Sequence, residues 1–217
     1  MTSRWIAYGW ALFAIAALSS CALTSKADLV EPRYFSPERV ELREQARPGT
    51  SVLPIAVRLG RVASSADLRE HIAHRDTEFE LGYYDDLRWN ERPEAYVRRA
   101  ISRALFERHG LPHAQMGNAA TLELELVAFE ELRLPKLHAA RIRLRALLYQ
   151  NDRVLLEQTV TTDRALPKDA RIDDVVAAMA TALEAAAETI ATKVETQLRG
   201  QAATSQPLSE AENVSKP

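Results

Sequence analysis

Residues 121–130 read TLELELVAFE and residues 141–149 read RIRLRALLY, and these two stretches decide the fold. In each stretch apolar and polar residues alternate with a period of two, the pattern of a β-strand with one buried face. The apolar residues expected to point inward are Leu122, Leu124, Leu126, Ala128, Ile142, Leu144, Ala146 and Leu148. Asn151-Asp152 is a two-residue turn signal that leads into a third strand at Val154–Thr162. Three such strands in sequence predict an antiparallel meander with one solvated face.

Two helical patterns flank this meander. The first begins at Pro93, which suits the first position of a helix, and ends at His109 before a glycine and a proline. The second runs from about Ile172 to Leu198, and its first turn holds two aspartates, where negative charge meets the positive helix end. Weaker strand patterns precede both helices at Val52–Leu59, Glu70–Arg75 and Glu78–Tyr84. The sequence therefore predicts an α+β fold: a two-layer sandwich of a mostly antiparallel sheet with two helices packed on one face.

The single cysteine, Cys21, follows an almost wholly hydrophobic segment, Trp5–Leu18, that Arg4 precedes. This is the layout of a secretory signal peptide, and the apolar run is shorter than the roughly 20 residues of a membrane-spanning helix. A cysteine directly after small residues resembles the lipobox of bacterial lipoproteins, where the thiol carries fatty acyl chains such as palmitate. We expect residues 1–20 to be a lipoprotein signal peptide and Cys21 to be lipidated; an ordinary signal peptide or an uncleaved anchor is the alternative. In that class an aspartate after the cysteine favours the inner membrane, so Ala22 favours the outer membrane, with the protein facing the periplasm.

Composition and charge separate one folded domain from its flanks. The chain has 217 residues with 28 basic and 30 acidic side chains, and this balance argues against nucleic acid as a partner. Residues 21–50 are polar and punctuated by prolines, which predicts a tether with one short ordered stretch near Tyr34-Phe35. Residues 51–198 hold the domain, and residues 199–217 are expected to be a disordered tail.

The sequence carries no recognisable catalytic set. It has no nucleophile elbow, no phosphate-binding glycine loop and no Cys/His cluster at metal-binding spacing. His71 and His74 stand three residues apart, but their segment has an extended pattern, so surface histidines are favoured over a metal site. We therefore expect a non-enzymatic protein with no cofactor and no metal.

Six residues are candidates for contact with a partner or a membrane: Tyr83, Tyr84, Trp89, Leu132, Leu134 and Leu137. The three leucines are interleaved with basic residues in the connection Glu131–His138, which a proline interrupts. Such a loop can dock on a partner or touch a membrane surface, and it can equally fold back beneath the sheet as a satellite cluster, which is favoured. For the three aromatic residues, a core cluster that fixes the entry of the first helix is favoured over a lipid or partner groove.

A row of arginines, Arg141, Arg143 and Arg145, lies on the expected solvated face. Glu123 and Glu125 project from the neighbouring strand with the same period, so we expect opposite charges to pair across the strands at about 0.2–1 kcal/mol each. Contact of the arginines with lipid phosphates is the alternative.

Several stretches resemble the auxiliary lipoprotein component of ABC-type transport systems, the paraquat-inducible protein C-like family. They are the stretch from Cys21 to Lys26 followed by Arg33–Glu38, then Tyr83-Tyr84 through Arg88-Trp89 to Pro93, and the run from Asp173 to Met179. The segment Gly60–Glu70 departs from the family pattern, because it is more polar and richer in serine.

This resemblance implies a small α/β sandwich in residues 51–198 and a non-enzymatic periplasmic part of an ABC transport system. It implies as partners an MCE-domain protein and the ABC permease and ATPase, with a role in lipid transport between the envelope membranes and in membrane integrity. Of the functional residues that the resemblance implies, only the lipidated cysteine has a counterpart in this sequence, which is Cys21. A periplasmic lipid-binding carrier and an assembly factor for an outer-membrane complex are the alternatives, and homo-oligomerisation stays open.

Overall fold

The computed structural model describes residues 31–38 and 56–204. The elements follow in the order β1 (Arg33–Phe35), β2 (Val57–Ser64), β3 (His71–Arg75), β4 (Leu81–Trp89), α2 (Pro93–Ser102), the π-helical η2 (Arg103–Arg108), β5 (Ala120–Leu134), β6 (Leu137–Gln150), β7 (Arg153–Ala165) and α3 (Ile172–Thr204). The expected signal peptide, Cys21, the first residues of the Val52–Leu59 strand and the chain beyond Thr204 lie outside the described residues.

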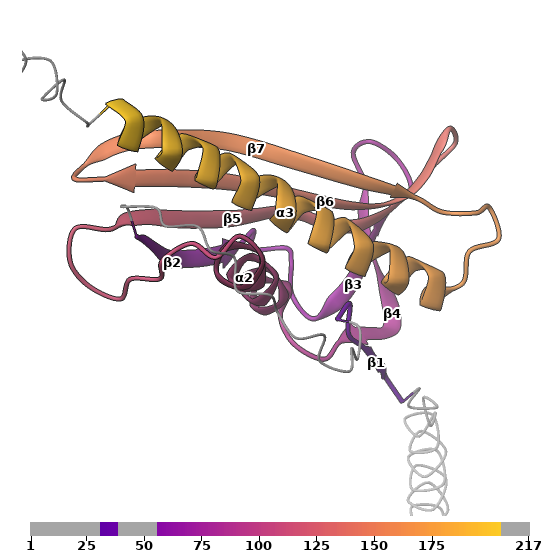
Figure 1. The fold of residues 1–217 in the computed structure, drawn as a ribbon. Helices are drawn as coiled ribbons and strands as arrows, with labels where there is room; N and C mark the ends of the chain where they lie inside the picture. The colour runs from indigo at the N-terminus through magenta and orange to yellow at the C-terminus, as the bar shows by residue number, and fades with distance from the viewer. Residues whose placement is uncertain (1–30, 39–55, 205–217) are drawn as a thin grey trace, which may run out of the picture. The chain divides into compact units, whose positions relative to one another are not determined.

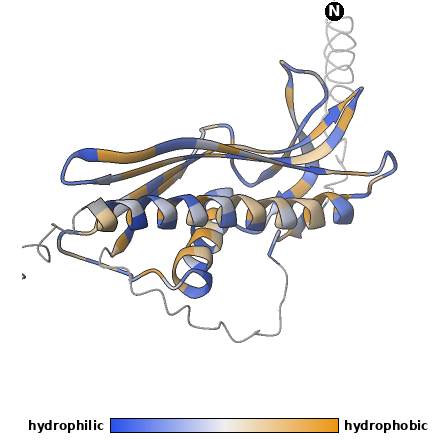
Figure 2. Ribbon diagram, turned by 45° about the horizontal axis from the view of Figure 1, so that its top comes forward, coloured by the Kyte–Doolittle hydropathy of each residue, from blue (hydrophilic) through white to orange (hydrophobic). Residues whose placement is uncertain are grey.

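The described strands form one seven-stranded mixed sheet in the order β1-β4-β3-β5-β6-β7, with β2 paired to β5. The pairs β5–β6, β6–β7 and β3–β4 are antiparallel. The short strands add parallel pairs: β1 with β4, and β2 and β3 one after the other along the same edge of β5. Figure 1 shows α3 along one face of the sheet with α2 beside it, and both helices lie on the same side in Figure 2. The predicted α+β class is confirmed, but the sheet is mixed and not purely antiparallel.

The meander β5–β6–β7 is the part of the fold that the alternating pattern predicts. Figure 2 shows the alternation of hydrophilic and hydrophobic residues along these long strands. The inward side chains of β6 and most of those of β5 belong to the buried core. Asn151 and Asp152 adopt φ values of 49° and 60°, the left-handed conformation of a tight hairpin turn, so the predicted turn is also confirmed.

Ala128 departs from the expected pattern because β5 contains a bulge. The register between β5 and β6 shifts between Leu126 and Ala128, after which Ala128 pairs with Arg143 and Phe129 pairs with the core residue Ile142. One extra residue in a strand reverses which side chains face the core. Phe129 therefore continues the core face, and the inward assignment of Ala128 was wrong.

Helix α3 covers β6 and β7 with one apolar stripe. Met179, Leu183, Ala186 and Ile190 are at most 1% exposed, as the helical spacing predicts. The helix continues to Thr204, beyond the expected end at Leu198. Its length and composition would also suit a membrane span, but half of its most apolar window is buried inside the protein, as in a core helix.

The first predicted helix has two parts. It begins at Pro93 as α2 and continues as the π-helical turn η2, which ends at Arg108; His109 caps it before Gly110, a residue with a φ of 63°. Tyr96, Val97, Ala100 and Ile101 are fully buried on its inner side. The wider π-helical turn changes the spacing of side chains, and the last residues of this helix contact α3 through charged groups.

Candidate functional site

The structure brings four of the six candidate contact residues, Tyr84, Leu132, Leu134 and Leu137, to one end of the sheet. There the hairpin β5–β6 turns at Pro135-Lys136, and β3 and β4 are joined by Asp76–Glu80. Because β3 runs parallel to β5 with Arg75 opposite Leu132, both turns lie at the same end, as Figure 1 shows. We call this region the turn end of the sheet.

The leucine-rich connection is a hairpin and not a loop. Leu134 pairs with Leu137 across the turn, and Leu132 pairs with Ala139 further along. Leu132 is fully buried but lies outside the main core cluster, whereas Leu134 and Leu137 are partly exposed. The expected loop over Glu131–His138 was therefore wrong, because the β5 and β6 strands continue through it on both sides of Pro135.

A buried carboxylate, Glu131, organises the turn end. Its side chain accepts a hydrogen bond of 2.6 Å from the Tyr84 hydroxyl and lies 2.7 Å from Nε2 of His138. Glu131 is only 2% exposed, so these two partners replace the water that would otherwise solvate its charge. Burial, and then the bond to the Glu131 carboxylate, raises the pKa of Tyr84 to about 12. Tyr84 is thus held as a neutral donor to a buried anion.

A second polar group surrounds the same tyrosine. Arg133 lies with its guanidinium 5.4 Å from the Tyr84 ring centre, donates to His74, and bonds Asp76 at 2.7 and 2.9 Å. The bond from Arg133 holds the pKa of the Asp76 carboxyl below its usual value. These contacts join β3, β4, β5 and β6 at the point where the sheet ends.

Gly82 makes room for this arrangement. A Cβ at position 82 would lie 2.5 Å from Cε1 of the His74 ring, closer than real atoms approach. The absence of a side chain at Gly82 leaves the space that the His74 imidazole occupies beside β4.

The other two aromatic candidates have separate surroundings. Trp89 is 1% exposed and packs edge-to-face against Phe129 and Tyr96 at ring distances of 5.1 and 6.3 Å. Trp89 is therefore a core residue at the entry of α2, and the favoured interpretation holds for it. Tyr83 is 39% exposed, and its hydroxyl donates to the backbone oxygen of Asp67 at 3.0 Å. Tyr83 is available to a ligand or partner.

One exposed residue at the turn end was missed by the sequence interpretation. Phe79 lies in the turn between β3 and β4 and is 94% exposed. The sequence had placed Phe79 in the expected strand Glu78–Tyr84, but β4 begins only at Leu81, so Phe79 lies in the turn, where burial is not expected. With Leu134 and Leu137 it gives the turn end an apolar character.

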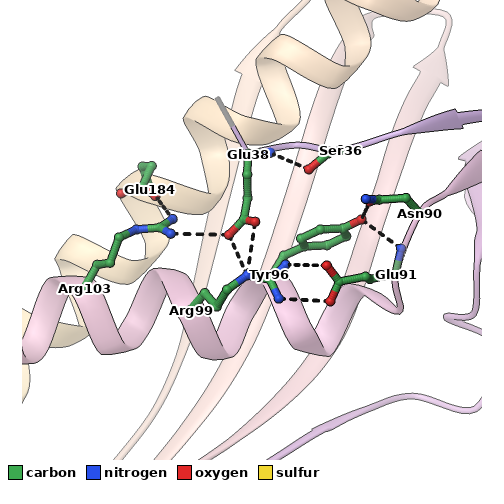
Figure 3. Close-up of polar contacts among 8 residues, drawn as sticks. All are labelled: Ser36, Glu38, Asn90, Glu91, Tyr96, Arg99, Arg103 and Glu184. Carbon is green, nitrogen blue, oxygen red and sulfur yellow. Dashed lines mark hydrogen bonds and ion pairs between the residues drawn. The ribbon is translucent and has the colours of Figure 1, made fainter. Parts of the chain in front are cut away.

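A separate charged network lies where the N-terminal segment meets the helices (Figure 3). Glu38 accepts hydrogen bonds from Arg99 at 2.9 and 3.1 Å and from Arg103 at 3.3 Å. Arg99 also bonds Glu91, and Arg103 bonds Glu184 of α3 at 2.9 Å. Together with the pairing of β1 to β4, this network fastens Arg33–Glu38 to α2 and α3.

The same network continues along α3 through His109. Its two ring nitrogens lie 2.6 Å from Glu195 and 2.7 Å from Glu188. Burial acts to lower the pKa of His109, but the bonds to the two carboxylates outweigh it and raise that pKa above its usual value. His109 therefore serves as a cation between two turns of α3.

The arginine row on the solvated face pairs with β7 more than with β5. Arg141 bonds Asp163 at 2.7 and 2.8 Å, and Arg145 bonds Glu157 at 2.6 Å. Of the two glutamates expected as partners, only Glu125 comes near, at 3.9 Å from Arg145. The prediction of cross-strand pairing is confirmed for Arg145 with Glu125, whereas the shorter ion pairs of Arg141 and Arg145 join β6 to β7, because β6 has acidic residues on both neighbouring strands.

In the described ranges, no three His, Cys, Asp or Glu side chains are placed to hold a metal ion. The polar groups at the turn end instead bond to one another. This arrangement suits structural stabilisation and recognition of a partner.

The comparisons with known proteins agree with this picture. The chain matches the family model of the ABC-type transport auxiliary lipoprotein component over residues 41–191. No curated protein matches the chain.

Two solved structures are similar in fold. Protein XCC0632 from Xanthomonas campestris is similar with a TM-score of 0.62 and 20% identity, covering 73% of this chain and 94% of that one. An uncharacterized protein of known structure is similar with a TM-score of 0.58 and 14% identity, covering 76% of this chain and 99% of that one. At these identities the likeness supports the fold alone. The family match spans more than half of the sequence, and the chain therefore belongs to the ABC-type transport auxiliary lipoprotein family.

Proposed function

We propose that this protein is an outer-membrane lipoprotein, anchored through Cys21, that serves as a non-enzymatic auxiliary component of an MCE-type ABC transport system for lipids. The family match over residues 41–191 carries this proposal, since that family consists of auxiliary lipoproteins of ABC transport systems. Two sequence features support the anchoring half: the apolar leader that ends at Cys21, and Ala22 after it.

We propose the turn end as the surface that meets the MCE-domain subunit. Phe79, Leu134 and Leu137 expose apolar surface there, and a hydrophobic centre with a polar rim is the usual composition of a protein contact. The surrounding polar groups are held by the bonds around Glu131 and Arg133, so the surface is rigid before it binds.

Mass spectrometry of the mature protein tests the anchor. The expected product begins at Cys21 and carries fatty acyl chains; an unmodified cysteine or an uncut leader would contradict the anchoring half. Membrane fractionation of the same sample separates outer from inner membrane.

Site-specific photocrosslinking tests the partner and its surface together. A photoreactive phenylalanine analogue at Phe79 should crosslink to the MCE-domain protein in cells. The same analogue at Val154, which is 54% exposed beside the turn between β6 and β7 at the other end of the sheet, is the matched control and should not. Equal crosslinking at both positions, or none at Phe79, would refute the proposed surface.

A further inference from the structure

A large bulge in β4 separates two parts of its pairing with β3. Ala73 pairs with Tyr83, but His71, only two residues earlier, pairs with Arg88. The backbone between Tyr84 and Arg88 therefore leaves the ladder and bends away from β3. Bulges of this kind redirect side chains and are common beside binding sites.

Arg88 holds the bulge in place without losing its charge. Its guanidinium donates to the backbone oxygens of Tyr84 at 3.1 Å, Leu87 at 3.0 Å and Asp85 at 2.7 Å. Neutral carbonyls fix the direction of a guanidinium but do not neutralise it. Arg88 is thus a cation oriented before any ligand arrives.

The bulge forms one wall of an open pocket of about 570 Å³, and the connection between β2 and β3 forms the other. The Tyr83 hydroxyl, bonded to the backbone of Asp67, joins the two walls. The charged and aromatic residues that line the pocket are Asp67, Arg69, His71, Tyr83, Tyr84, Asp85 and Arg88.

The pocket contains both signs of charge, and these charges do not neutralise one another. Across the ranges that the structure describes, neither Arg69 nor Arg88 forms an ion pair, and neither do Asp67 and Asp85. Elsewhere in the domain, Arg133 and Arg141 are each paired with a carboxylate. Two guanidinium groups and two carboxylates that share a pocket without pairing are complementary to a molecule carrying one charge of each sign.

We propose that this pocket binds a zwitterionic phosphoester, with the phosphate at Arg69 and Arg88 and the ammonium group at Asp67 and Asp85. Guanidinium groups donate in a geometry that matches phosphate oxygens, and carboxylates accept from an ammonium group. The edge of His71 and the ring of Tyr83, 5.9 Å apart, supply the apolar wall for the carbon atoms between the two charges. The ligand class is a phosphoethanolamine group. Its source as a phospholipid headgroup, and not a soluble phosphoester, rests on the proposed function.

An NMR titration of the mature full chain in a phosphate-free detergent tests the site. The probes are glycerophosphoethanolamine, which carries both charges, glycerophosphoglycerol, a phosphodiester that carries only the anion, and ethanolamine, which carries only the cation. Amide signals of the pocket should shift with a dissociation constant for glycerophosphoethanolamine about fivefold below that of either half molecule, since an exposed charge pair adds at most about that factor.

Two variants and two controls assign the charges. Arg69→Gln should weaken both phosphate-bearing probes about fivefold, whereas Asp85→Asn should weaken glycerophosphoethanolamine alone. Arg61→Gln and Asp169→Asn remove the same charges from exposed positions outside the pocket and should change neither.

Equal affinity for glycerophosphoethanolamine and glycerophosphoglycerol would overturn the zwitterion assignment, and the absence of saturable shifts would overturn the site. Displacement of the probe by dihexanoyl-phosphatidylethanolamine supports a lipid source, and failure to displace it overturns that source. Because crosslinking at Phe79 does not depend on this pocket, loss of headgroup binding and loss of the MCE contact are separate outcomes.

Discussion

Raising the pH from about 6 to about 8.5 should destabilise the folded chain through His109, since the pKa of a free histidine is about 6.5. The carboxylates of Glu188 and Glu195 raise the pKa of His109 in the folded state. The folded chain therefore binds this proton more tightly than the unfolded chain. The stabilisation is complete below the unfolded pKa and is lost as the pH rises through the higher folded pKa.

The size of the effect follows from the exposure of the partners. His109 and Glu195 have side chains that are 13% and 20% exposed, so their 2.6 Å contact is a partly buried charged hydrogen bond of about 1.5 kcal/mol. Glu188 is 49% exposed, and its contact contributes only about 0.5 kcal/mol. Neutral His109 keeps one N–H donor, which leaves a loss of about 1–1.5 kcal/mol on deprotonation.

Lowering the pH should weaken the same contact through its other partner, Glu195. The bonds from His109 and then Arg199 lower the pKa of Glu195, so its contribution is present above the usual pKa of a glutamate and is lost as the pH falls through the lower folded value. Arg108 also bonds Glu188, so this carboxylate stays paired when His109 is neutral. The His109 contribution is therefore largest between about pH 4.5 and pH 6.5.

Urea unfolding of the full chain and of His109→Gln at both pH values checks this reasoning. The wild-type chain should lose about 1–1.5 kcal/mol more than the variant between the two conditions, because every other titrating group is common to both proteins. If both chains lost the same free energy of unfolding, the account of His109 as a cation between the two carboxylates would be refuted.

Three further substitutions test other parts of the structure by the same unfolding assay. Tyr84→Phe should lower the free energy of unfolding by about 1.5–3 kcal/mol, because the buried carboxylate of Glu131 loses a hydrogen-bond donor. The control Tyr83→Phe should lower it by less than about 1 kcal/mol. Equal losses in the two variants would contradict the role of Tyr84. Leu183→Ala should cost about 2–5 kcal/mol by opening a cavity beneath α3, and a loss below 1 kcal/mol would speak against the packing described. Gly82→Ala should cost about 1–3 kcal/mol by displacing the His74 ring, and unchanged stability would show that the ring can move freely.

The sequence predicted the meander and both helices because their periods are local and long. Alternation over ten or more residues defines β5 and β6, and spacings of three and four define the stripe of α3. The same reasoning failed at Ala128, because inserting one residue such as Val127 into a strand leaves no mark on composition. It also failed at Pro135. The proline was taken as the sign of a long loop, but it lies in the tight turn between β5 and β6, and both strands continue up to that turn.

Pairing between distant segments was the main feature that the pattern could not supply. The parallel neighbours of β5 join residues about sixty positions apart, and nothing local specifies such a partner. The group around Glu131 likewise collects side chains from four strands, and only Tyr84 among them was a candidate. The sequence did not predict the unpaired charges beside the β4 bulge, because no pattern distinguishes Arg69 and Asp85 from other charged surface residues.

The three residues of β1 set a limit on how far the domain can stand from a lipid leaflet. If Cys21 carries the anchor, the chain from Cys21 to Arg33 reaches at most about 43 Å when fully extended, at up to about 3.6 Å per residue. A tether that continued to residue 50 would have reached more than about 100 Å. Because the chain joins β4 at Arg33, this first strand of the domain would stay within that distance of the leaflet, and the domain could reach further only by its own length.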